Sequence, residues 1–142
     1  MKADFMDLWK EDVVEAFFWP DENTTAYFEY EISPSDRELP ILVSNNKGVL
    51  HRWMPFHYEA DRKTKHVVSE RTRNGEVIAW MAECYIPYTL LKPLKNIDPK
   101  PGTRWRANFY RVDYDKGEAE WSWQLTGPSF HDYEKFGTLL FE

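Results

Sequence analysis

The sequence has little cysteine, no long apolar run and fewer basic than acidic residues, and each shortage excludes a class of protein. The single cysteine, Cys84, excludes an internal disulfide and any metal site built from several cysteines. No stretch of about 18 apolar residues occurs, so the sequence predicts no membrane-spanning helix. The net charge of −6 argues against nucleic-acid binding, which needs a basic surface.

Common catalytic motifs are missing as well. The chain has no G-x-S-x-G nucleophile motif and no glycine-rich phosphate-binding loop, and its histidines are not spaced as zinc ligands. Acidic side chains are plentiful, and two carboxylates can hydrolyse a glycosidic bond when the fold brings them together. A glycoside-processing enzyme that uses Glu15, Glu29 or Glu31 therefore remains an alternative, although no motif points to catalysis.

The start of the chain, MKADFMDLWKED, lacks the apolar core of a signal peptide. Two locations are consistent with this. A cytoplasmic protein is expected if Met1 is the native start, and an extracellular or periplasmic protein is expected if an export signal has been trimmed from the chain.

The first part of the chain predicts a β-hairpin. Residues 13–20, VVEAFFWP, are rich in β-branched and aromatic side chains and end at a proline. Residues 26–33, AYFEYEIS, alternate so that Tyr27, Glu29 and Glu31 share one face, which is typical of a half-buried antiparallel strand. The turn-forming segment PDENTT separates the two strands.

The rest of the chain continues the β pattern. The Asn74-Gly75 pair predicts a second hairpin turn, and residues 104–113 alternate over a long strand. We therefore predict one all-β domain over residues 1–142. Its expected architecture is an antiparallel β-sandwich, of jelly-roll or immunoglobulin-like type, with about seven or eight strands and almost no helix.

One loop offers a weak calcium signal. In PDENTT, the side chains of Asp21, Glu22 and Asn23 are hard oxygen donors, which calcium prefers. A solvated turn is the favoured explanation of the same residues. No other cofactor is expected.

Aromatic residues are the feature that the sequence has in excess, at 17% of the chain. Many will pack in the core, but Trp9 lies in the polar segment before the first strand. Phe130 and His131 lie in a turn-rich segment before the last strand. Rings presented at one end of a sandwich, with polar groups beside them, are typical of a small-ligand pocket. The alternative is that Trp9 and Phe130 only cover the open ends of the core.

Several segments together resemble the family 9 carbohydrate-binding modules and the related DOMON-like group. They are LWKEDVVEAFFWPDENTTAYFEYEISP, IPYTLL, PGTRWRANFYRVD and SWQLTGPSFHDYEKFGTLLFE. The resemblance extends from Leu8 to Glu142 and is loosest over residues 41–73. It implies a non-catalytic sugar-binding sandwich that accompanies polysaccharide-degrading enzymes such as glycoside hydrolases.

The resemblance also implies a set of ligand-binding residues. Trp9 and Phe130 match the two rings that sandwich a terminal sugar in the family, although binding members carry Trp at the second position. Glu15 and Asn108 match polar positions that hold the sugar hydroxyls.

The charged side chains expected at this sugar-binding site differ from those of the family. Glu29 stands about where binding members carry an arginine, and Arg111 or Arg106 is expected to compensate. We place Arg111 in the ligand-binding set, with His131 at the rim.

Two further expectations follow from the resemblance. The strands that precede this segment in family members have no counterpart before Asp7, so we expect a homodimer in which a second chain completes the sandwich. The related group also includes haem-binding sandwiches with Met and His axial ligands. Met54 and His57 are the pair that would serve, which keeps haem binding as a minor alternative.

Overall fold

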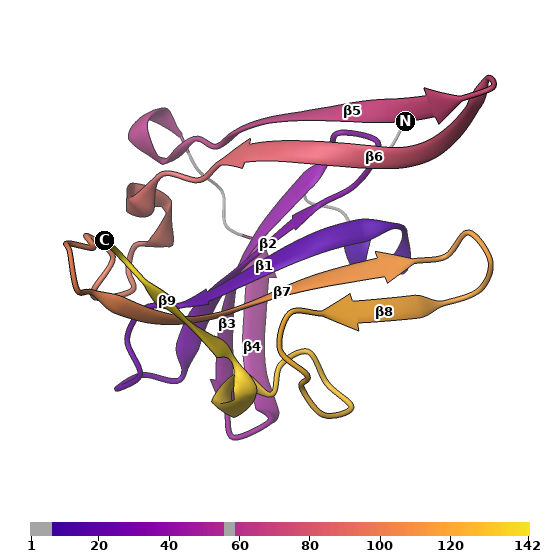
Figure 1. Cartoon of the computed structure of the whole chain (residues 1–142). Helices are drawn as coiled ribbons and strands as arrows, with labels where there is room; N and C mark the ends of the chain where they lie inside the picture. Colours follow the sequence, from indigo (N-terminus) through magenta and orange to yellow (C-terminus); the bar gives the residue numbers. More distant parts are fainter. Residues whose placement is uncertain (1–6, 56–58) are drawn as a thin grey trace.

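The computed structural model describes residues 7–55 and 59–142, without the side chains of 52–55. Strands dominate the described residues, and the helical segments are short stretches of 3-10 helix (Figure 1). The strands are Val13–Trp19 (β1), Ala26–Ile32 (β2), Glu38–Asn46 (β3), Val49–Pro55 (β4), Lys65–Arg73 (β5), Glu76–Tyr85 (β6), Arg104–Asp113 (β7), Ala119–Ser122 (β8) and Gly137–Leu140 (β9). The 3-10 segments are Leu8–Lys10 (η1), Ala60–Arg62 (η2), Tyr88–Leu91 (η3) and Tyr133–Lys135 (η4).

Two sheets form the architecture. Seven strands make one antiparallel sheet in the order β4-β3-β2-β1-β7-β8, and β9 also pairs with β7. The β5–β6 hairpin is a separate two-stranded sheet that lies over one face of the larger one (Figure 1). The prediction of an all-β antiparallel sandwich is therefore confirmed, with layers of unequal size. No helix in the described part of the chain is long and apolar enough to cross a membrane.

The alternation predicted for β2 is present, but both of its faces are buried. Tyr27 lies in the apolar cluster on one face of the large sheet, and Phe28 and Tyr30 lie in the cluster on the other face. The sequence suggested a half-buried strand. The difference arises because β5, β6 and η3 cover the second face, where Leu90 and Leu91 pack against β2.

The first face holds the larger core. Aromatic rings from distant parts of the chain meet around Phe17, which is fully buried. Its ring centroid lies 5.0 Å from that of Tyr110 on β7 and 5.9 Å from that of Phe136, just before β9. Contacts of this kind bury large apolar areas and fix the relative positions of the strands.

The central position of β1 sets the register of the sheet. Glu15 pairs with Glu31 of β2 on one side and with Tyr110 of β7 on the other. Phe17 pairs in the same way with Glu29 and with Asn108 of β7. Directly paired residues point to the same face of a sheet. The register therefore gathers these side chains on the first face.

The segment between β8 and β9 is attached to this face by Arg106 of β7. The guanidinium donates hydrogen bonds to the backbone carbonyls of Glu134, Phe136 and Gly137. Gly137 begins β9 directly against Trp123, where a Cβ would lie 2.5 Å from the indole ring. A side chain at this position would push the segment out of place.

We predict that Gly137→Ala lowers the free energy of unfolding by about 1–3 kcal/mol, as expected for overpacking. Chemical denaturation measures the change. Gly127→Ala is the matched control, because its Cβ would meet no atom closer than 3.5 Å. Equal stability of the two variants would contradict this account of the contact.

Candidate functional site

A cavity of about 480 Å³ opens on the first face of the large sheet. All six strands from β4 to β8 in the order of the large sheet contribute to it, together with η1, the turn between β7 and β8 and the segment before η4. Its lining residues are Trp9, Glu15, Phe17, Glu29, Glu31, Ile41, Leu50, Val112, Tyr114, Glu118, Glu120, Pro128, Ser129, Phe130 and His131.

Three buried carboxyl groups form the floor of this cavity. Glu15, Glu29 and Glu31 are each at most 5% exposed. One carboxylate oxygen from each lies within 4.8 Å of the others, because β1 and β2 are neighbours and the three side chains share one face. We call these residues the glutamate cluster.

Burial controls the protonation of the cluster. It raises the pKa of Glu15 to about 8, with smaller contributions from the carboxylates of Glu29 and Glu120. Burial and the charge of Glu15 raise the pKa of Glu31 to about 8. The pKa of Glu29 is also raised well above its ordinary value, first by burial and then by Glu31. The cluster therefore favours holding protons at neutral pH.

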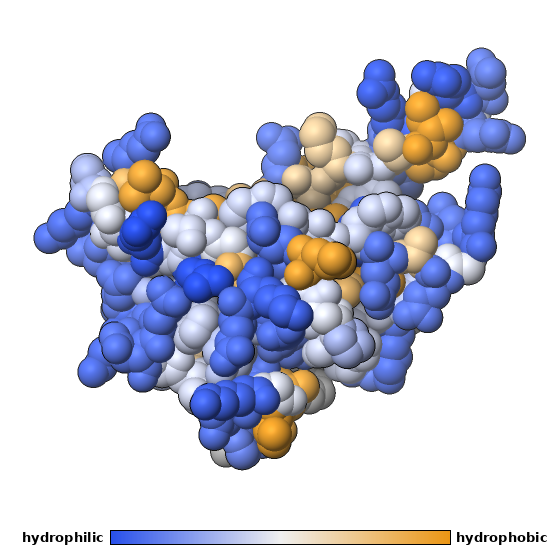
Figure 2. Space-filling model, turned by 60° about the horizontal axis from the view of Figure 1, so that its bottom comes forward, coloured by the Kyte–Doolittle hydropathy of each residue, from blue (hydrophilic) through white to orange (hydrophobic). Residues whose placement is uncertain are grey.

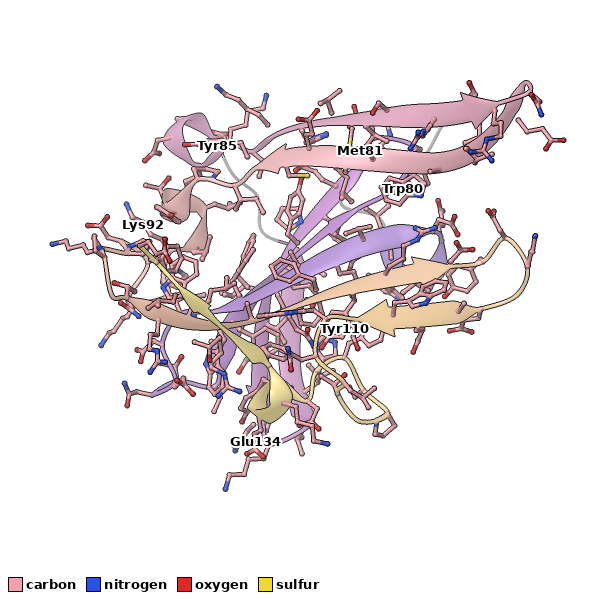
Figure 3. All side chains as sticks on the ribbon, in the orientation of Figure 1. Trp80, Met81, Tyr85, Lys92, Tyr110 and Glu134 are labelled. Carbon is pink, nitrogen blue, oxygen red and sulfur yellow. The ribbon has the colours of Figure 1, made fainter. Side chains whose placement is uncertain are left out.

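Aromatic rings form the walls. Phe130 is stacked on Tyr110, with ring centroids 4.1 Å apart and planes 11° from parallel. The Tyr110 hydroxyl also donates a hydrogen bond of 2.8 Å to the Phe130 carbonyl, which fixes the backbone as well as the ring. Tyr110 lies on the cavity side of β7 (Figure 3). On the other side, the Tyr114 hydroxyl donates to the carbonyl of Trp9 at 3.1 Å.

His131 joins the wall to the core as a neutral ring. Its Nδ1 lies 2.5 Å from the hydroxyl of Tyr27, and its carbonyl accepts a hydrogen bond from the side chain of Asn45. Burial lowers the pKa of His131 to about 4, so the imidazole is uncharged at neutral pH. Among the described residues that line the cavity none is lysine or arginine, which leaves glutamate as its only charged residue type.

The structure brings together four of the residues expected to bind a ligand. Trp9, Glu15, Phe130 and His131 all line the cavity, although the first two are more than 100 positions away from the last two. Trp9 and Phe130 also pack against the core cluster while they line the cavity. This contact is what the alternative prediction, that the two rings cover the end of the core, expects.

Asn108 and Arg111 do not line the cavity. Asn108 is fully buried, and its amide nitrogen donates hydrogen bonds to the Tyr110 hydroxyl and the Gln124 carbonyl. Its oxygen accepts from two backbone N–H groups, so its hydrogen-bonding capacity is used inside the protein. It supports the ring on which Phe130 is stacked.

Arg111 corrects one expectation. It lies on the opposite face of β7, where its guanidinium is 5.3 Å from the ring of Trp80 on β6. It also forms an ion pair of 2.6 Å with Asp113. Alternation along β7 turns Arg111 away from Tyr110. No arginine among the described residues lines the cavity, and Arg106 holds the β8–β9 segment.

The PDENTT loop is a turn, and its donors are already used. The side-chain oxygen of Asp21 accepts hydrogen bonds from the backbone and side chain of Asn23 at 3.0 and 2.8 Å. Glu22 forms an ion pair with Arg106 at 3.2 Å. The calcium signal in this loop is thus better explained by the turn itself. His57 and the side chain of Met54 lie outside the described residues, so the haem alternative is not tested.

Sequence reasoning did not place Glu29 and Glu31 in the ligand-binding set. The sequence does contain a signal for this cluster. A hairpin centred on Asn23 pairs Glu15 with Glu31, and the observed register has this pairing. Tyr114, Glu118 and Glu120 also line the cavity, and they come from a turn and a short strand with no distinctive pattern.

Comparisons of sequence find relatives of this chain but no family. No protein-family model matches the chain. It is 30% identical over 89 residues to the UPF0462 protein C4orf33 homolog of Mus musculus, covering 63% of this chain and 39% of that protein. It is 29% identical over 113 residues to an "Extracellular protein" of Arthroderma benhamiae, covering 75% of this chain and 47% of that protein. The chain thus spans less than half the length of these two relatives.

A solved structure is similar over almost the whole chain. It is a protein from Bacteroides uniformis whose suggested role is carbohydrate binding, with a TM-score of 0.75 and 23% identity, covering 99% of this chain and 65% of that one. At this identity the likeness shows the same fold. The finer resemblance to family 9 modules stays a prediction, because no family model matches.

We predict that the free energy of unfolding falls as pH rises from about 4.5 to about 8. The unfolded chain releases the protons of the cluster near pH 4.5, whereas folded Glu15 and Glu31 hold theirs until about pH 8. The contribution of the cluster to stability is therefore fully present below about pH 4.5 and is lost as pH rises through 8, with a slope of at most about 1.4 kcal/mol per pH unit for each carboxyl. The lowered pKa of His131 opposes this trend by one proton below about pH 6.5. Chemical denaturation across this range measures it.

Glu15→Gln should reduce this slope, because an amide cannot ionise. Glu70→Gln, at an exposed position of β5, is the control and should leave the slope unchanged. A wild-type slope in Glu15→Gln would refute the assignment of the buried proton.

Proposed function

We propose that this protein binds carbohydrate without catalysis, as an accessory module of polysaccharide-degrading systems. The observation that carries the proposal is the meeting of Trp9 and Phe130 at one cavity above buried polar groups. Its volume of about 480 Å³ is within the range of small-molecule sites, about 300–1,000 Å³. The suggested role of the Bacteroides uniformis protein adds support from the same fold.

The chemistry of the cavity suits a neutral, hydroxyl-rich ligand. The C–H faces of a sugar ring stack on aromatic side chains, and Phe130 keeps one face for this because Tyr110 covers the other. At neutral pH, Glu15 and Glu31 are largely protonated, so they can donate hydrogen bonds to sugar oxygens as well as accept them. Ser129 and His131 add polar atoms at the wall.

The expected affinity is modest. An aromatic contact contributes about 0.5–1.5 kcal/mol beyond simple burial. Two such contacts and a few hydrogen bonds correspond to a dissociation constant that is micromolar or weaker. A single sugar unit should bind weakly and reversibly, as befits a module that works beside an enzyme.

Isothermal titration against a panel of mono- and oligosaccharides tests the proposal. At least one sugar should bind, and Trp9→Ala should weaken its binding by about tenfold through loss of a stacking surface. Trp121→Ala is the matched control, because Trp121 is 55% exposed on β8 and does not line the cavity. The absence of heat with every sugar would instead support a ligand-free structural domain of the same fold.

A glycoside-processing enzyme is the second candidate, and the glutamate cluster is the observation that favours it. A carboxyl with a pKa of about 8, such as Glu15, has the protonation of a general acid. The reaction also needs an ionised carboxylate partner, however, and the pKa values of all three members of the cluster are raised. We expect no turnover of chromogenic glycosides.

We also propose that two copies of this chain associate through the β5–β6 hairpin. β5 and β6 form a two-stranded sheet with unpaired outer edges among the described strands. Its outward side chains include Val67, Met81 and Tyr85, each more than half exposed. The tip of this hairpin projects from the body of the molecule, with apolar side chains among charged ones (Figure 2). Exposed edges and apolar faces of this kind favour pairing with another strand, and we propose a second copy of this chain.

Light scattering at micromolar concentration should give twice the mass of the chain. Met81→Lys combined with Val67→Lys should shift the mass toward one chain, because both changes place a charge on the outer face. Leu125→Lys, at a position 87% exposed outside the hairpin, is the control. A single-chain mass for the wild type would exclude the dimer.

A further inference from the structure

We propose that the glutamate cluster is a binding site for one divalent cation, and that calcium is the ion that fits it best. The proposal concerns the floor of the cavity and stands without any bound sugar. The ligands would be carboxylate oxygens of Glu15, Glu29 and Glu31.

The spacing of the oxygens fits the ion. One oxygen from each carboxylate lies within 4.8 Å of the other two. Calcium binds oxygen at about 2.3–2.6 Å, so two oxygens on opposite sides of the ion lie about 4.6–5.2 Å apart. Carboxylate ligands with no nitrogen or sulfur among them select a hard cation. Magnesium demands shorter bonds of about 2.0–2.1 Å in a strict octahedron, which two β-strands with a fixed register supply less readily.

Glu31 shows that the cluster is incompletely satisfied by the protein. Its side chain is 0% exposed and lines the cavity, and neither of its carboxylate oxygens forms a well-shaped hydrogen bond with a described residue. The side chain of Glu29, a member of the same cluster, and the backbone of Trp9 lie near enough to favour its charged form. A buried carboxylate without a full set of partners is costly, and the cost is removed by a proton or by a bound cation.

The lining of the cavity attracts a cation, and none of the lining residues that the structure describes is a lysine or an arginine. Glu118 and Glu120 also line the cavity, and the charge of Asp7 acts on Glu31. His131 is neutral at neutral pH because burial lowers its pKa to about 4. A cation would therefore meet acidic side chains and no other positive charge among the lining residues that the structure describes.

A second acidic cluster serves as a comparison. Asp12, Asp113 and Asp115 also bring three carboxylates together, but protein groups already contact them. Arg111 pairs with Asp113, and backbone N–H groups of Tyr114 and Asp115 donate to Asp12 and Asp113. These carboxylates are only partly buried or exposed. The glutamate cluster differs from this second cluster in two ways, because its carboxylates are buried and no cationic side chain among the described residues pairs with them.

The ion would also take part in ligand binding. Calcium takes about 6–8 ligands, so three carboxylates leave positions open toward the cavity. If the proposed function is correct, sugar hydroxyls held between Trp9 and Phe130 can fill some of these positions. This step rests on the proposed function, whereas the cation site itself does not.

Calorimetric titration of chelator-treated protein with calcium at pH 8 tests the site. We expect one calcium per chain, a rise in melting temperature with calcium, and weaker responses to magnesium and manganese. Glu31→Gln and Glu15→Gln should each weaken calcium binding at least tenfold, and Asp115→Asn should leave it unchanged. Without calcium, the glutamine variants should melt no lower than the wild type, because a neutral amide replaces a buried acid.

Two results would overturn the site. They are no heat and no thermal shift with any of the three metals in the folded wild type, or equal calcium affinity in Glu31→Gln and Asp115→Asn. Tighter binding of magnesium or manganese than of calcium would overturn the choice of calcium. Glu31→Asp, which keeps the charge but shortens the side chain, replaces Glu31→Gln if that variant fails to fold, and it too should bind calcium more weakly.

Sugar titrations with and without calcium separate the two proposals. A sugar affinity that rises with calcium supports the shared site. Sugar binding that calcium does not change would overturn the coordination of hydroxyls but not the cation site, and calcium binding without sugar binding would overturn the proposed function alone.

Discussion

The pairing of β1 with β2 and β7 at the same time is the constraint on which the rest of the structure depends. It sets Glu15 and Phe17 side by side with residues from both neighbours. A shift of one residue in either ladder would turn these side chains to the opposite face. The aromatic core around Phe17 then holds the register, because a shift would remove its ring from those of Tyr110 and Phe136.

The part of this arrangement that involves strands adjacent in the sequence could be predicted from the sequence. The β1–β2 hairpin has alternation on both strands and a turn between them, so its faces follow from neighbouring residues. The pairing of β7 with β1 is different, because no turn connects them. The family resemblance places both Asn108 and Arg111 in the site, but alternation along one strand sends these two positions to opposite faces, and the register turns Arg111 toward Trp80. Asn108 is on the expected face, but its amide is used by Gln124 and Tyr110, which sequence patterns do not reveal.

The site combines two features that usually exclude one another. Its walls are aromatic and apolar, and its floor holds three acidic side chains that the walls keep from water. Protons, a cation or a ligand that donates hydrogen bonds can each satisfy the floor. The same burial therefore accounts for the raised pKa values, the proposed calcium site and the preference for a hydroxyl-rich ligand.

The burial of β2 on both faces has a consequence for the evolution of the protein. Neighbouring positions in this strand belong to different neighbourhoods: Glu29 and Glu31 face the cavity, and Tyr30 and Ile32 face the layer made by the hairpin and η3. Substitutions at positions 29 and 31 can change the ligand chemistry, while positions 28, 30 and 32 are constrained by packing. A strand of this kind lets binding diverge among relatives without rebuilding the scaffold, provided that insertions and deletions are confined to the loops.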